Sequence, residues 1–120
     1  MIVAGIGCRR GCPAADIVAL VQLAQRQAGC RVEALAAPEF KRDEAGLHEA
    51  ARLLDVGLRF IDATALAAVQ PHCPTRSTAA AEHAGVASVA EGSALAATGG
   101  TLLLARIANG KATCALAARA

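Results

Sequence analysis

Residues 1–21 read MIVAGIGCRRGCPAADIVALV, a short apolar run joined through a basic turn to an Ala/Val/Leu-rich segment. The run 2–6 is bounded by glycines and is typical of a buried strand. Pro13 stands where the first turn of a helix tolerates proline, and apolar residues then recur at helical spacing as far as Ala28. Gly29 ends this helix. The N-terminal part therefore predicts a strand, a tight basic turn and a helix.

The middle of the chain continues the alternation of strand and helix. Apolar segments at 31–38 and 58–62 predict two further strands. A helix that begins at residue 43 or 44 lies between them. A short helix at 63–69 follows the third strand, and the side chain of Asp62 is expected to cap it. Strands that alternate with helices are typical of a parallel sheet.

The C-terminal part has a different pattern. The segment 70–77, QPHCPTRS, predicts a loop, a short helix is expected at 77–84, and a longer helix is expected from Ser88 to the glycine pair at 99–100. Two β-like runs flank Asn109-Gly110, a strong signal for a tight antiparallel hairpin. We therefore expect an α/β fold in a single domain over 1–120. Its mixed, mostly parallel sheet of about five strands would lie between helical layers and end in an antiparallel hairpin.

Composition limits the classes of partner. Hydrophobic residues make up 55% of the 120 residues, with alanine the most frequent of them, two Phe and no Trp or Tyr. A net charge of +2 is too mild to indicate a nucleic-acid partner. No segment approaches the roughly 20 apolar residues that cross a bilayer, and the N-terminus lacks the pattern of a signal peptide. We expect a cytoplasmic protein that binds neither nucleic acid nor membrane.

The cysteines predict free thiols and no metal site. They are five in number and irregularly spaced, at positions 8, 12, 30, 73 and 114. Cys8 and Cys12 match neither a CxxC redox motif nor a zinc knuckle, and the histidines do not complete a ligand set. We expect neither a metal nor a cofactor.

The segment GIGCRRG at 5–11 differs from nucleotide-binding loops. Its third glycine falls at Gly11, whereas the dinucleotide fingerprint requires position 10, and no Gly-Lys-Ser/Thr of a P-loop occurs. Both classes are rejected. The remaining functional interpretation is an anion site, because helix-start amides carry partial positive charge and Arg9 and Arg10 add forked donors. The alternative is that both arginines are solvated loop charges.

Other residues have competing structural and chemical interpretations. The Cys8 thiol, beside a helix start, could be acidified and nucleophilic, but the sequence places no general base near it. Ser88 and Glu91 have the Ser-x-x-Glu spacing of a capping box, which is a sufficient structural explanation. Lys41 and Glu44 predict a solvated charge pair.

Three stretches together resemble the CobE / CbiG C-terminal domain family of cobalamin biosynthesis. They are GIGCRRG at 5–11, the stretch 41–47 with its Lys…Glu-Ala-Gly-Leu pattern, and GVASVAE at 85–91. The resemblance covers essentially the whole chain and is closest to the stand-alone CobE type. It implies a three-layer α/β/α domain that acts in building the corrin ring. It also implies the following binding-motif residues: Gly5, Gly7, Cys8, Arg9, Arg10, Gly11, Lys41, Glu44, Ser88 and Glu91.

Three functional hypotheses follow. In the first, the chain binds a precorrin or corrin intermediate, whose rim carboxylates suit a basic helix start, with Arg9 and Arg10 as their partners. Without Tyr or Trp, an apolar Ala/Val/Leu wall would face the macrocycle. In the second, the chain is a small hydrolase that opens a lactone, with Cys8, Glu44 and Glu91 as catalytic candidates. In the third, it is a docking module for another enzyme of the pathway.

Overall fold

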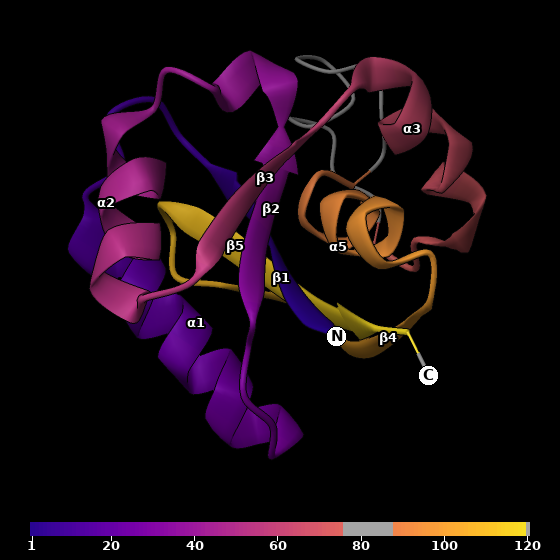
Figure 1. Cartoon of the computed structure of the whole chain (residues 1–120), viewed down its shortest axis with the longest axis horizontal. Helices are drawn as coiled ribbons and strands as arrows, with labels where there is room; N and C mark the ends of the chain where they lie inside the picture. Colours follow the sequence, from indigo (N-terminus) through magenta and orange to yellow (C-terminus); the bar gives the residue numbers. More distant parts are fainter. Residues whose placement is uncertain (76–87, 120) are drawn as a thin grey trace.

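A computed structural model describes residues 1–75 and 88–119, and in this part of the chain five strands form one sheet (Figure 1). The strand order is β3-β2-β1-β5-β4. β1, β2 and β3 run parallel, whereas β5 is antiparallel to both of its neighbours. The strands are β1 (Ile2–Cys8), β2 (Ala34–Pro38), β3 (Gly57–Ile61), β4 (Thr101–Ala108) and β5 (Ala112–Ala118).

Helices cover both faces of this sheet and complete three layers (Figure 1). On one face lie α1 (Ala14–Ala28) and α2 (Ala45–Leu54), and on the other α3 (Ala63–Ala68) and α5 (Ala90–Thr98). Two short 3-10 helices, η1 (Glu39–Lys41) and η2 (Gln70–His72), follow β2 and α3. The expected α/β fold with a mixed five-stranded sheet is confirmed.

The main core lies between the sheet and the α1/α2 layer. Alternate residues of β1 point to opposite faces, so Ile6 packs toward α1 and α2 while Val3 packs toward α3 and α5. Ile17 of α1 and Leu47 of α2, both fully buried, join Ile6 in this core. Branched aliphatic side chains therefore fill the centre of the domain.

The α5 layer packs unusually close to the sheet. A Cβ built on Gly5 of β1 would lie 1.9 Å from the carbonyl oxygen of Ala90, at the start of α5. A real Cβ could not lie so close to this oxygen. The backbone of α5 can approach β1 this closely only because residue 5 is a glycine. The backbone of α5 therefore lies directly over β1.

Local signals are confirmed at several element ends. Asp62 Oδ1 accepts a hydrogen bond from the amide of Ala65 at 2.8 Å, as expected for the cap of α3. Gly29 ends α1 in the left-handed conformation. Asn109 and Gly110 form the turn between β4 and β5, with Gly110 at φ +89°.

Some expectations differ from the structure or lie beyond its described part. Between β2 and α2 the chain forms η1, for which no element is predicted, and part of the expected loop at 70–77 is η2. The helix expected at 77–84 lies outside the described residues. None of the helices in 1–75 and 88–119 is both long and apolar enough to span a membrane.

Candidate functional site

The segment after β1 is a tight turn fixed by backbone hydrogen bonds. The amide of Cys12 donates to the carbonyl of Arg9 at 3.1 Å, and Gly11 lies at φ +74°. A positive φ at the third position is what a type II turn requires, which explains the glycine. The amide of Arg9 donates to the carbonyl of Lys111 at 3.0 Å and so ties the turn to the β4–β5 hairpin. Arg10 lies at the tip of this turn.

The start of α2 holds the other side of the turn. Glu44 Oε2 accepts a hydrogen bond from the amide of Gly11 at 3.0 Å. A Cβ built on Gly46 would lie 2.1 Å from the carbonyl oxygen of Cys12, so glycine allows this close contact. The predicted charge pair is wrong, because within the described residues Lys41 and Glu44 form no ion pair and the carboxylate binds the turn instead.

Basic side chains are concentrated around this turn. Arg9 and Arg10 are exposed, and within 1–75 and 88–119 neither guanidinium has a carboxylate partner. Lys41 is half-buried and its charge acts on the thiols of Cys8 and Cys12, and Lys111 Nζ lies 3.8 Å from Asp16 Oδ2. The carboxyl ends of β1, β2 and β3 meet at this edge, which Figure 1 shows at the top, where parallel sheets usually bind ligands. The turn therefore presents two exposed guanidinium groups to solvent at this edge of the sheet.

Cys8 lies beneath the turn and is not an activated thiol. Burial raises the pKa of the Cys8 thiol to about 11, although the Lys41 ammonium offsets part of this effect. The nearby Cys12 and Glu44 raise the pKa further. The thiol is therefore protonated at neutral pH, the form that does not act as a nucleophile.

Glu91 lies on the opposite side of the sheet. Its side chain is fully buried, and its carboxylate accepts hydrogen bonds from the amide and hydroxyl of Thr75, both at 2.9 Å. It also accepts one from the amide of Arg106 of β4 at 3.0 Å. The predicted capping box is therefore wrong, because Val89 is the N-cap of α5 and Glu91 binds distant segments. The carboxylate satisfies buried donors that packing brings to it.

The backbone of Ser88 is held by the side chain of Gln70. Its amide donates to Gln70 Oε1 at 2.9 Å and its carbonyl accepts from Gln70 Nε2 at 3.0 Å. Its hydroxyl is buried and has no hydrogen-bond partner among the described residues. Residues 85–87 of the same motif lie outside the described part.

The motif residues thus form two groups on either side of β1. Cys8 packs on the α1/α2 face, next to Lys41 and Glu44. Val89 lies over the end of β1 on the other face, with its Cγ1 3.6 Å from a Cβ built on Gly7. The sheet therefore separates Glu91 from Cys8 and Glu44, and the three catalytic candidates do not share one site.

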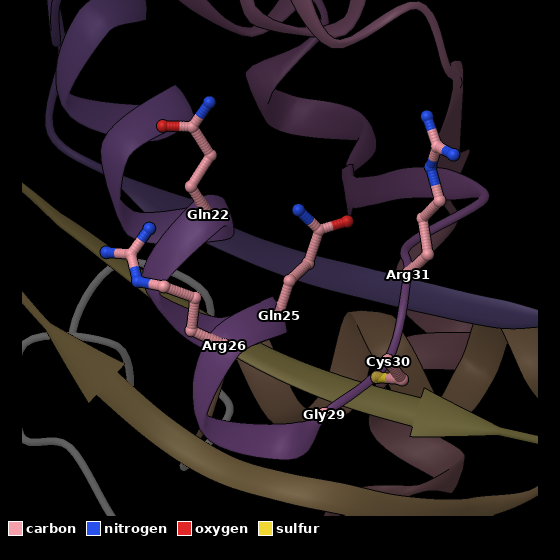
Figure 2. A pocket seen from close by; sticks show the side chains of 6 residues that line it. All are labelled: Gln22, Gln25, Arg26, Gly29, Cys30 and Arg31. Carbon is pink, nitrogen blue, oxygen red and sulfur yellow. The ribbon is translucent and has the colours of Figure 1, made fainter.

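Two depressions lie at the opposite edge of the sheet. One, of about 700 Å³, is an open hollow where α1 ends and the chain enters β2 (Figure 2). A second, of about 810 Å³, extends from there to Leu53 at the end of α2. No sequence motif predicted these depressions. Polar, charged and apolar side chains together form their lining. The first is lined by Gln22, Gln25, Arg26, Gly29, Cys30 and Arg31.

Fold and site together define a three-layer α/β/α domain with a basic, glycine-framed turn at the carboxyl edge of its parallel strands. The chain belongs to the family described as the C-terminus of cobalamin synthesis protein G, whose model matches residues 2–117. It is accordingly a protein of cobalamin biosynthesis.

Similarity to individual proteins of the same pathway supports this assignment. The chain is 32% identical to Protein CobE of a Sinorhizobium species over 121 residues, which cover 97% of this chain and 79% of the relative. It is similar to the crystal structure of CobE, a protein from the cobalamin biosynthetic pathway, with a TM-score of 0.94 and 36% identity. That match covers 100% of this chain and 91% of the other. The crystal structure of cobalamin biosynthesis protein chiG from Agrobacterium tumefaciens matches with a TM-score of 0.81 and 40% identity, covering 100% and 99%.

Proposed function

We propose that this protein binds an acidic precorrin or corrin intermediate at the turn after β1. One observation carries the proposal. Arg9 and Arg10 are exposed on a turn whose backbone is held by hydrogen bonds, and no carboxylate in the described residues forms an ion pair with them. A turn whose backbone is already fixed loses little backbone conformational freedom when a ligand binds.

The chemistry of the macrocycle matches this arrangement. Early corrin intermediates carry acetate and propionate carboxylates around a large ring, and guanidinium groups bind carboxylates through two parallel hydrogen bonds. Lys41 adds a third positive charge on the α2 side of the turn. Several separated cations suit a ligand whose anionic groups are spread around a rim.

The arrangement favours binding over catalysis by this chain. A lactone hydrolase that uses Cys8 would need a thiolate, and burial keeps this thiol protonated. Glu91 is engaged by Thr75 and Arg106 and is separated from the turn by the sheet. Glu44 is the remaining carboxylate near Cys8, and its Oε2 already accepts the Gly11 amide.

The test is a titration with hydrogenobyrinic acid, a corrin with free carboxylates, followed in the visible spectrum. We expect saturable binding that weakens as salt is added, because surface charge attraction is screened. A corrinoid whose carboxylates are converted to amides is the control and should bind much more weakly. Absence of saturable change would contradict the proposal. Conversion of a lactone-bearing precorrin by the isolated chain would favour the hydrolase instead.

A further inference from the structure

Phe40 is an aromatic ring that the core does not use. It is one of two phenylalanines in the chain, and 54% of it is exposed. The other, Phe60, packs against the main core and lies 5.7 Å from the His48 ring, centroid to centroid. Exposure of a single apolar residue is common in proteins, so the position of the Phe40 ring has to decide its role.

Phe40 lies in η1, at the carboxyl edge of the sheet where the basic turn lies. Lys41 connects the two: its Nζ is 6.0 Å from the centroid of the Phe40 ring, and its charge acts on the Cys8 thiol below the turn. Three residues further on, Glu44 bonds directly to Gly11. The exposed ring therefore lies beside Lys41, in the segment that leads into α2, and the start of α2 is bonded to the turn that carries Arg9 and Arg10.

We propose that the face of the macrocycle lies against the Phe40 ring while Arg9 and Arg10 bind carboxylates at its rim. This inference rests on the proposed function and adds the residue that contacts the face of the ring. Aromatic rings stack favourably on other π-systems in offset geometry. The composition predicts only small aliphatic side chains against the macrocycle, and Phe40 supplies the aromatic surface.

The test compares Phe40→Leu with the matched control Leu53→Ala. Leu53 is 55% exposed and lines the depression at the opposite edge of the sheet. With hydrogenobyrinic acid as the probe, Phe40→Leu should weaken binding by about tenfold, in line with the contribution of an aromatic pair. Leu53→Ala should leave the affinity unchanged. Citrate has carboxylates but no ring. Its own affinity, measured by competition with the corrin, should therefore be the same in wild type and Phe40→Leu.

Phe40→Trp gives an independent readout. The chain has no tryptophan, so this substitution introduces a single indole fluorophore at the proposed contact. We expect near wild-type affinity and strong quenching of its emission when the coloured macrocycle binds. Leu53→Trp, far from the turn, should be quenched much less.

Separate outcomes overturn the two proposals. If wild type binds the corrin and an Arg9→Ala/Arg10→Ala variant does not, but Phe40→Leu binds normally, the stacking role is wrong and the proposed function stands. If wild type does not bind the corrin, both are wrong. If Phe40→Leu instead lowers the melting temperature substantially, the ring is structural and the inference is overturned.

Discussion

The carboxylate of Glu44 accepts a hydrogen bond from the amide of Gly11, with 3.0 Å between Oε2 and N. The two residues are 33 positions apart, so this bond joins two motifs that are separate in sequence into one structural unit. Glu44 holds the turn in place, but its negative charge also opposes an anionic ligand beside Arg9 and Arg10. The two effects can be separated by mutation.

Glu44→Gln should strengthen the binding of a polycarboxylate corrin. Glutamine keeps an oxygen that accepts from Gly11 but removes the charge, so we expect an affinity gain of about two- to fivefold, as for a solvated charge interaction. Glu44→Ala removes the acceptor too and should bind no better than Glu44→Gln. Isothermal titration with hydrogenobyrinic acid measures both. Weaker binding by Glu44→Gln would show that the carboxylate itself is needed.

Gly5→Ala should destabilise the fold, because the new methyl group would meet the backbone of Ala90 in α5. Overpacking against backbone costs about 1–3 kcal/mol or more in the free energy of unfolding. Gly57→Ala in β3 is the matched control, since a Cβ there meets no atom within 4 Å. Urea denaturation followed by circular dichroism measures both variants. Equal midpoints would contradict the close packing of α5 on β1.

The arrangement of strands and helices was predictable because its signals are local. Gly29 ends α1, Asp62 caps α3, and Asn109-Gly110 closes the hairpin, each through bonds to residues a few positions away. Alternation of strand and helix then implies the parallel order of β1, β2 and β3. Tertiary packing adjusted these elements at their ends but did not replace them.

The contacts of the site were not predictable in the same way, because distant residues make them. Ser88 and Glu91 have the spacing of a capping box, yet the Glu91 carboxylate binds Thr75 and Arg106. A signal for this was present: Glu91 is the one charged residue in the apolar stretch 88–98. A helix that is apolar all round is buried, so its single carboxylate needs buried partners.

Glu91→Gln should lower stability through these partners. Three donors point at the carboxylate, and an amide would turn its NH₂ group toward at least one of them. Leaving a buried donor unsatisfied costs about 1–3 kcal/mol in the free energy of unfolding. Glu49→Gln, which removes an exposed ion pair with Arg52, is the control and should leave the melting temperature nearly unchanged. Unchanged melting of Glu91→Gln would contradict a structural role.

Cys8 should react with iodoacetamide only at high pH. The thiolate is the reactive form, and burial places the pKa of this thiol near 11, against an ordinary value of 9.0. At pH values below 9 its rate should be about a hundredfold lower than that of an ordinary thiol, and it should rise through pH 11. Lys41→Met should shift the profile further upward, because the ammonium lowers this pKa. Peptide mass spectrometry resolves Cys8 from the other cysteines, and fast alkylation at neutral pH would revive the nucleophile hypothesis.

Replacing Arg9 and Arg10 together by alanine should weaken corrin binding and leave the fold intact. Each charge-assisted contact contributes about 1.5–3 kcal/mol, so the loss of two should lower the affinity by about two orders of magnitude or more. Lysine at either position should recover only part of the loss, because it keeps the charge but not the forked geometry. Visible titration with hydrogenobyrinic acid measures the affinities.

Arg31→Ala is the matched control for this pair, because Arg31 is also exposed but lies at the opposite edge of the sheet. Its affinity for the corrin should equal that of wild type. Thermal melting should be the same in all three proteins, since the side chains of Arg9 and Arg10 make no ion pair in the described part of the chain. If the double variant binds normally but melts at a much lower temperature, the arginines stabilise the turn and do not recognise the ligand.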